Sequence, residues 1–211
     1  MKKISDNSST ANGRKNLVIV ESPAKARTIG RIMGDGYEVV ACLGHTRDLP
    51  EKRLGVMIEK DFEPTYVVPA EKRALIATLK NLGAGASDIY LATDPDREGE
   101  AIAWHLQEAV GWSERPVLPR RVVFHEITEE AIREAFSDPH EIDMNLVNAQ
   151  QARRVLDRLY GFLPSKLLRS KVQRGMSAGR VQSPALRLIV DREKEISEFV
   201  PVESWTLDAV F

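Results

Sequence analysis

The chain has 211 residues, of which 43% are hydrophobic and 29% charged, and its formal net charge is −1 at pH 7. This composition is that of an ordinary globular protein large enough to bury a core, and the net charge alone points to no partner. The single cysteine, Cys42, excludes a disulfide framework and a cysteine-based zinc site and fits a reducing cytoplasm, and no apolar run approaches the length of a membrane span.

The first third of the chain begins with residues 1–16, which are polar, lack the apolar core of a signal peptide and predict a disordered tail. The apolar run at 17–20 predicts a strand. Ser22 as N-cap and Pro23 at the first helical position then predict a helix that ends at Gly34. The sequence YEVVACLGH at 37–45 predicts a second strand followed by a glycine turn.

The same order of strand and helix continues downstream. Residues 65–83 predict a strand and a helix, and residues 88–111 predict a strand to about Ala92, an acidic loop and a helix that ends near Gly111. Residues 121–136 repeat the pattern, with Thr128 as the N-cap of a helix. Strands that alternate with helices indicate a mostly parallel α/β sheet, which binds its ligands at the carboxyl ends of the strands.

After Pro139 the pattern becomes helical, and we place a domain boundary near Ser137. Helices are expected over 143–163 and 164–172, and over 183–199 with Ser183 as N-cap and Pro184 at the first helical position. The last nine residues, ESWTLDAVF, read as the start of an alternating strand.

Four carboxylates are crowded into the seven residues from Asp94 to Glu100. Like charges at this spacing repel one another unless a cation lies among them. Asp94, Asp96 and Glu98, with Glu21 after the first strand, are therefore candidate ligands for Mg²⁺, which prefers hard oxygen ligands and bridges to phosphate. The alternative is structural: Asp94 caps the following helix and the other acids pair with Arg97 or lie in solvent.

Three further residues near the predicted sheet edge are candidates for phosphate chemistry. Glu21 is a candidate general acid or base, and Lys25 is a candidate to hold a phosphate oxygen at a helix N-terminus. His45 follows Gly44 in a predicted turn and is a candidate phosphate contact. For each of the three, an ordinary structural or solvent-exposed role stays open.

The segment from Gln151 to Arg180 carries eight basic residues against one acid, Asp157. Spacings of four residues place an arginine stripe on the predicted helix, and arginine forks suit phosphates. The small-residue loop after it lets a backbone approach closely, and Phe162 can stack on a base, although a core role is the alternative. The candidate DNA-binding residues here are Arg153, Arg154, Asp157, Phe162, Arg169, Ser177, Ala178, Gly179, Arg180, Val181 and Gln182.

Six segments together closely resemble the bacterial type IA DNA topoisomerases: LVIVESPAKARTI, GHTRDLP, LATDPDREGEAIAWHL, RVVFHEIT, NAQQARRVLDRLYGF and SAGRVQSPALRLIVDRE. The resemblance implies a TOPRIM domain at 17–137, a Rossmann-like, mostly parallel sheet with helices on both faces. It implies that 138–211 is the truncated start of a helical DNA-binding domain. The acidic TOPRIM set alone is shared with primases and some nucleases, which stay open as alternatives, as does a silent single-strand DNA-binding module.

The resemblance also implies a function. Such enzymes break one DNA strand without ATP, hold its 5′ phosphate on a tyrosine, pass a strand through the break and reseal it, using Mg²⁺. It assigns Glu21 and Lys25 to the scissile phosphate, Asp94, Asp96 and Glu98 to Mg²⁺, and His45 with the basic segment to single-stranded DNA. It further implies a cytoplasmic, nucleoid-associated monomer.

One feature of the family's pattern has no match in this sequence. The nucleophile of these enzymes lies in a Tyr-Met-Arg-Thr-Asp-Ser type of motif, and none of Tyr37, Tyr66, Tyr90 and Tyr160 has that context. We therefore expect this chain alone to lack strand-cleaving activity.

Overall fold

Four parallel strands form the sheet that organises the first part of the chain, and their order is β2-β1-β5-β6. They are β1 (Asn16–Val20), β2 (Tyr37–Ala41), β5 (Ile89–Leu91) and β6 (Arg120–Arg121). The structure is a computed structural model and describes residues 14–115 and 117–211, so the tail predicted at 1–16 lies almost wholly outside the described residues. The parallel sheet confirms the predicted α/β class.

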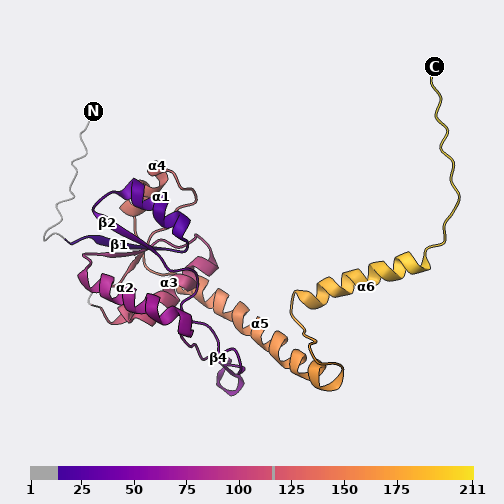
Figure 1. Cartoon of the computed structure of the whole chain (residues 1–211), viewed down its shortest axis with the longest axis horizontal. Coiled ribbons are helices and arrows are strands. Elements are labelled where there is room, and N and C mark those ends of the chain that lie inside the picture. The colour runs from indigo at the N-terminus through magenta and orange to yellow at the C-terminus, as the bar shows by residue number, and fades with distance from the viewer. Residues whose placement is uncertain (1–13, 116) are drawn as a thin grey trace. The chain divides into compact units, whose positions relative to one another are not determined.

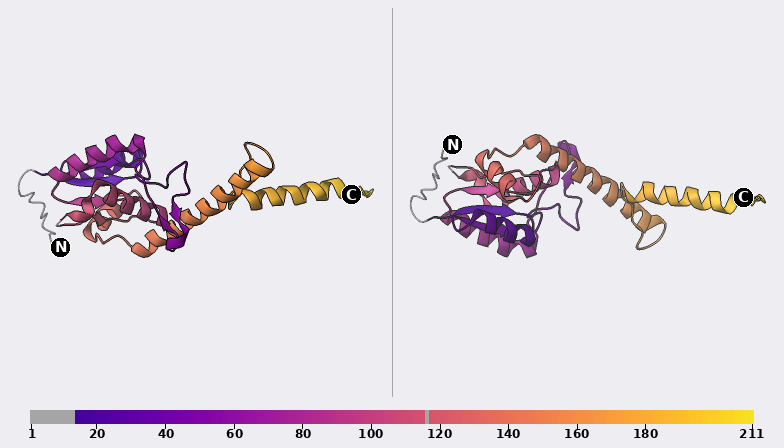
Figure 2. Two further views of the ribbon diagram at one scale, coloured as in Figure 1. Left: turned by 90° about the horizontal axis from the view of Figure 1, so that it is seen from below. Right: turned by 90° about the horizontal axis from the view of Figure 1, so that it is seen from above.

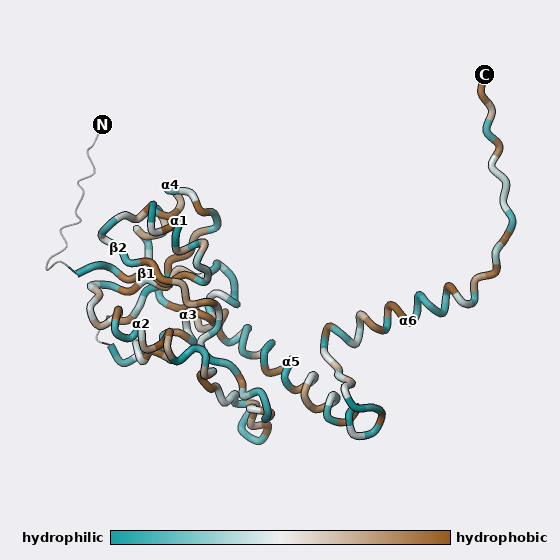
Figure 3. The backbone as a smooth tube through the Cα atoms, in the orientation of Figure 1, coloured by the Kyte–Doolittle hydropathy of each residue, from teal (hydrophilic) through white to brown (hydrophobic). Residues whose placement is uncertain are grey.

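Two helices cover each face of this sheet (Figures 1 and 2). α1 (Pro23–Met33) and α4 (Glu129–Ser137) pack on one face, and α2 (Arg73–Gly85) and α3 (Arg97–Val110) pack on the other. Successive side chains of a strand point to opposite faces, so β1 contributes to both cores. Leu17 and Ile19 join the α2–α3 core, and Val18 and Val20 join the α1–α4 core. Figure 3 shows this hydrophobic colour along β1.

Three predicted helix ends in the first unit are confirmed by the capping geometry. Ser22 Oγ accepts a hydrogen bond from the Lys25 N–H at 3.3 Å, and Thr128 Oγ1 accepts one from the Ala131 N–H at 3.3 Å. Gly111 follows α3 with a φ of 79°, a backbone conformation that glycine adopts without steric cost. These short-range interactions hold the loops at both ends of the sheet in place.

An excursion between β2 and α2 carries a small antiparallel pair, β3 (Val56–Met57) and β4 (Glu63–Pro64), and extends away from the sheet (Figure 1). The strand predicted at the start of 65–83 is wrong. Val67 makes only an isolated bridge with Asp48. Because Asp48 lies in a loop and not in a strand, the pairing does not propagate. Two short 3₁₀ turns, η1 (Ile58–Lys60) and η2 (Ala70–Lys72), lie in this excursion, and a third, η3 (Trp112–Glu114), follows α3.

The long helix α5 (Met144–Lys171) runs across the division between the two compact units of the chain, which falls between Val155 and Leu156. The break predicted at Pro164 is wrong, since Pro164 lies inside α5. A proline removes one backbone donor and the helix tolerates that loss here. None of the helices in the described part of the chain is long and apolar enough to cross a membrane.

The second unit contains the end of α5, a loop, and α6 (Gln182–Glu198). The prediction that Ser183 caps α6 is wrong. The helix begins two residues earlier than predicted, at Gln182, so Pro184 falls within its first turn, where a missing N–H costs little. The strand predicted for the last nine residues is also wrong, because residues 199–211 form no strand. A strand is stable only when another strand pairs with it.

Candidate functional site

The acidic groups predicted at the sheet edge begin with Glu21, which follows β1 directly, and Asp94, which follows β5. Glu21 Oε1 accepts a hydrogen bond from the Asp94 N–H at 3.0 Å, and the Lys25 ammonium forms an ion pair with Asp94 Oδ1. Burial raises the pKa of the Glu21 carboxyl, and the neighbouring Asp94 carboxylate raises it further. The carboxyl ends of these two adjacent strands thus bring an acid, a lysine and a second acid together.

The loop after β5 is shaped by very close backbone packing. Asp96 caps α3, because its Oδ1 accepts a hydrogen bond from the Gly99 N–H at 2.8 Å. Thr93 Oγ1 donates to the Gly99 carbonyl oxygen at 2.6 Å. A Cβ atom on Gly99 would lie 2.1 Å from the Asp94 carbonyl oxygen, so only glycine fits here. The alternative that Asp94 caps the helix is therefore wrong, because Asp96 has that role.

Glu98 lies in the first turn of α3 and contacts two residues that are distant in the sequence. Its Oε2 is 3.3 Å from His45 Nε2 and accepts a hydrogen bond from Gln150 Nε2 at 3.2 Å. The predicted His45 therefore lies against the acidic loop. Gln150 was missed as a site residue, although the quoted motif NAQQARR contains it.

The four predicted carboxylates share one edge of the sheet without forming a closed cluster. Among residues 14–115 and 117–211, no three His, Cys, Asp or Glu side chains are grouped so that they could hold a metal ion. Asp94 pairs with Lys25, Asp96 caps a helix, and Glu98 pairs with His45 and Gln150. The structure therefore brings Glu21 next to Asp94 and leaves Asp96 and Glu98 engaged with other partners.

A cluster of aromatic rings lies beside His45 and was not predicted. The guanidinium of Arg47 is 4.7 Å from the ring centroid of Trp104, and Arg47 Nε donates to His105 Nδ1 at 3.3 Å. Burial lowers the pKa of His105 to about 3, and the charge of Arg47 adds to the effect. His105 is thus a neutral acceptor that holds Arg47 beside Tyr66, whose ring centroid is 4.5 Å from that of His105.

The predicted arginines of α5 that fall in the first unit are Arg153 and Arg154. Arg154 forms a two-pronged contact with Asp48, in which Nε donates to Oδ1 at 2.9 Å and an Nη donates to Oδ2 at 2.7 Å. Arg153 is exposed. Asp48 lies in the quoted motif GHTRDLP, yet nothing in its spacing indicated that it would hold an arginine 106 positions away.

The predicted residues of the second unit gather around the loop between α5 and α6. Arg180 Nε donates to Asp157 Oδ1 at 2.5 Å, which raises the pKa of Arg180. The Ala178 N–H donates to Ser165 Oγ at 2.9 Å, and Arg169 Nε donates to the Met176 carbonyl oxygen at 3.1 Å. The remaining predicted residues are on the same two segments: Ser177 and Gln182, which contact each other at 3.5 Å, half-buried Phe162 and Gly179, and exposed Val181.

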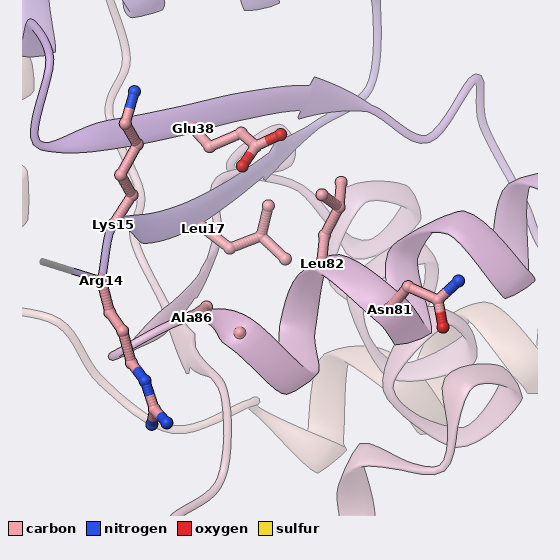
Figure 4. A pocket seen from close by; sticks show the side chains of 8 residues that line it. Arg14, Lys15, Leu17, Glu38, Asn81, Leu82 and Ala86 are labelled. Atoms are coloured by element: carbon pink, nitrogen blue, oxygen red, sulfur yellow. The ribbon is translucent and has the colours of Figure 1, made fainter.

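A separate cavity of about 280 Å³ lies at the other end of the sheet, where β1 and β2 begin (Figure 4). It contains none of the predicted site residues. Its lining residues are Arg14, Lys15, Leu17, Glu38, Asn81, Leu82, Gly85 and Ala86.

Comparison with known proteins agrees with this geometry. A family model of the Toprim domain matches residues 16–127, and a model described as DNA topoisomerase matches residues 141–211. DNA topoisomerase 1 of Campylobacter jejuni is 55% identical over 199 residues, which cover 94% of this chain and 28% of that protein. Full-length topoisomerase I of Thermotoga maritima matches in structure with a TM-score of 0.78 and 48% identity, over 87% of this chain and 31% of that one.

The chain thus spans less than a third of the length of either relative. The Toprim match covers the sheet and the acidic residues at its edge, and the topoisomerase match covers α5 and α6. The chain belongs to the Toprim family and, within it, to the type IA DNA topoisomerases.

Proposed function

We propose that this chain supplies the acid, metal and part of the DNA-binding groups of a type IA topoisomerase, which relaxes negative supercoils through single-strand breakage, passage and rejoining. The observation that carries the proposal is the convergence of Glu21, Lys25 and Asp94 at the carboxyl ends of β1 and β5. An acid, a cation and a candidate metal ligand within one contact network suit the chemistry of a phosphodiester.

The domain division belongs to the same proposal. Residues 17–137 would form the Toprim domain, and residues 138–211 would form part of a helical domain that binds DNA. The matches at 16–127 and 141–211 support this division, although compactness alone divides the chain within α5.

Toprim domains generally bind Mg²⁺. The residues present fit such an ion in chemistry, because Glu21, Asp94, Asp96 and Glu98 offer only hard carboxylate oxygens on one edge of the sheet. Burial raises the pKa of Glu21 and the charge of Asp94 raises it further, and a nearby cation would offset both effects. When bound, the ion would neutralise charge on the phosphate, and Lys25 would exchange Asp94 for a phosphate oxygen.

Glu21 is suited to move a proton at the scissile phosphate. Its pKa is raised by burial, so its carboxyl holds a proton at a higher pH than an exposed glutamate does. Its contact with the Asp94 N–H keeps it oriented at the end of β1. Protonation of the leaving oxygen is the role that this geometry supports.

Single-stranded DNA is the proposed substrate, bound through the arginines of α5 and the loop that follows. Asp48 holds the fork of Arg154, so this side chain is already oriented before a phosphate arrives, and Asp157 accepts a hydrogen bond from Arg180 Nε. His45, Arg153, Phe162, Arg169 and residues 177–182 would complete this DNA-binding set. The net charge of −1 for the whole chain does not argue against DNA binding, because many of the basic residues are concentrated in one segment.

Strand cleavage needs a nucleophile, and we propose that this chain alone provides none. Burial raises the pKa of Tyr90 and raises that of Tyr66 to about 12, which disfavours the phenolate of both. Tyr37 packs against Tyr90 and Phe136. Tyr160 is 44% exposed, and the sequence around it does not match the family's nucleophile motif.

The test of the metal site is calorimetry of Mg²⁺ binding to wild type and to an Asp94→Asn, Asp96→Asn variant. We expect binding to weaken strongly in the variant, because two of the four oxygen donors lose their charge. An Asp35→Asn, Asp61→Asn variant, with both changes outside the site, is the control. Equal Mg²⁺ uptake by all three proteins would refute the metal assignment.

The test of the function mixes this chain with a separately produced tyrosine-bearing remainder of a type IA enzyme. Mg²⁺-dependent relaxation of negatively supercoiled plasmid and a covalent 5′-phosphotyrosyl adduct are expected from the mixture and from neither part alone. Glu21→Ala in this chain should abolish both products. Relaxation by this chain alone would contradict the assignment of the nucleophile to another segment.

A further inference from the structure

A buried ion pair joins β6 to α3 behind the acidic loop. Arg121 Nε donates to Glu100 Oε2 at 2.9 Å, and the exposed fractions of the two side chains are 0% and 3%. Removing two charges from water is costly, and an apolar pair of the same size would often be at least as stable. A role in stability alone therefore does not explain why these two residues occupy this place.

The two terminal nitrogens of Arg121 donate hydrogen bonds to the end of β5 and the loop that follows. One terminal nitrogen donates to the carbonyl oxygens of Leu91 and Thr93 at 2.6 and 3.2 Å, and the other donates to that of Asp94 at 3.2 Å. The guanidinium thus fixes the backbone immediately before and at the first carboxylate of the proposed metal site. Apolar side chains cannot supply these bonds.

The second carboxylate oxygen of Glu100 accepts a hydrogen bond at the start of α5. Oε1 accepts a hydrogen bond from the Asp143 N–H at 2.8 Å. Asp143 immediately precedes α5 and caps it, because its Oδ1 accepts from the Asn145 N–H at 2.8 Å and its carbonyl oxygen accepts from the Val147 N–H at 3.1 Å. One carboxylate therefore touches both the arginine that holds the acidic loop and the first turn of the helix that carries Gln150, Arg153 and Arg154.

We propose that Arg121 and Glu100 are positioning residues that couple the acidic loop, residues 94–98, to the first turn of α5. A change in charge at Asp94 shifts the carbonyl groups that Arg121 binds, and the pair passes this shift through Glu100 to the Asp143 N–H. Occupancy of the acidic loop then alters the start of the helix that carries the DNA-binding arginines. This inference rests on the proposed function for its meaning, but the coupling itself is a property of the chain alone.

The test is hydrogen exchange of individual amides in the whole chain, for wild type and two variants. Glu100→Gln keeps an acceptor for the Asp143 N–H and removes the charge that Arg121 needs. Arg121→Lys keeps the charge and removes the fork that holds three carbonyl oxygens. Arg120→Lys is the matched control, because Arg120 is on the same strand, is half exposed, and has an ion pair with Asp88 at 3.7 Å.

In Arg121→Lys we expect exchange at 143–147 to accelerate roughly tenfold, because a charge-assisted network loses its geometry. Glu100→Gln should give a similar acceleration at 94–98, and Arg120→Lys none at either segment. The amides of β1 report global stability, and their exchange rates should change far less than those at 143–147. The backbone of Arg121 pairs with that of His140, and lysine keeps this pairing. The Asp143 N–H instead bonds to Glu100, so acceleration there in Arg121→Lys measures coupling through the two side chains. Unchanged exchange at 143–147 in Arg121→Lys, or equal acceleration in β1, would overturn the proposal.

A second arm adds Mg²⁺. In wild type, exchange should slow at 94–98 and also at 143–147, whereas in Arg121→Lys it should slow at 94–98 only. If Mg²⁺ slows both segments equally in wild type and in the variant, the pair does not transmit the effect and the coupling is refuted. If Mg²⁺ has no effect on 94–98 in wild type, the proposed metal function fails, and the comparison of the metal-free variants still decides the coupling.

Discussion

Helices α3 and α6 show how differently the two units of this chain use their side chains. α3, with 14 residues, buries eight of them, whereas α6, with 17 residues, buries none. Figure 3 shows alternating hydrophobic and hydrophilic colours along α6, so its apolar residues are present but remain exposed. Hydrophobic side chains alone therefore do not make a core, because a core needs a second surface to pack against.

The difference extends to how each unit holds its candidate functional residues. In the first unit, Glu21 and Asp94 follow buried strands, and their positions depend on a packed sheet. In the second unit, Arg169, Ala178 and Arg180 are held by hydrogen bonds between α5 and the loop after it. Segments with few buried contacts open more readily, so we expect the second set to adapt to a ligand and the first set to be preorganised.

The largest expected effect compares two leucines. Leu106 on α3 is fully buried, and Leu106→Ala should lower the free energy of unfolding by about 2–5 kcal/mol, through lost burial and a residual cavity. Leu188 on α6 is 72% exposed, and Leu188→Ala should change it by less than about 0.5 kcal/mol. Urea denaturation measures both. Similar losses for the two variants would mean that α6 is as well packed as α3.

Two glycines should give effects of opposite sign. Gly99→Ala should lower the free energy of unfolding by about 1–3 kcal/mol, because its Cβ would meet the Asp94 carbonyl oxygen at 2.1 Å. Gly161 lies inside α5 with its nearest neighbour, the Ala178 carbonyl oxygen, at 3.7 Å, so Gly161→Ala should raise it by about 0.5–1 kcal/mol. Thermal and urea unfolding check the signs. A stabilising Gly99→Ala would contradict the close packing of the acidic loop.

A third effect is the dependence of stability on pH, and it arises in the first unit, because residues 156–211 contain no histidine. The pKa of His105 is lowered to about 3 in the fold, so between pH 6.5 and 3 the unfolded chain binds the proton more readily than the folded one. The free energy of unfolding should therefore decrease as the pH is lowered below 6.5. The loss should be about 1–2 kcal/mol at pH 5 relative to pH 7.

Denaturation of wild type and His105→Gln at pH 7, 6 and 5 measures this loss. The variant should show a shallower decline, since glutamine keeps an acceptor for Arg47 without a titrating ring. His125, which is exposed, supplies the control, and His125→Gln should keep the wild-type slope. If His105→Gln also kept that slope, His105 would not be the group responsible.

Much of the first unit was predictable because its signals are local. A β-branched run, a serine or threonine cap and a glycine stop act within a few residues, so β1, α1, α3 and α4 were correctly expected. The convergence of Glu21 and Asp94 on one edge was also predictable, since both directly follow parallel strands. The predictions of a break at Pro164 and of a strand after Glu198 were wrong. Local propensity does not specify the contacts that keep a proline within a helix or that pair a strand.

The sequence by itself determined which residue types follow each strand and where most helices begin, because hydrophobic period and capping are short-range effects. Only the tertiary structure decided which of those residues meet. Glu98 contacts His45 and Gln150 across 53 and 52 positions, and Asp48 holds Arg154 across 106. Arg121 lies in the short edge strand β6, yet it is completely buried. Its role follows from the carbonyl groups that the folded sheet brings within its reach, and no pattern along the chain encodes that proximity.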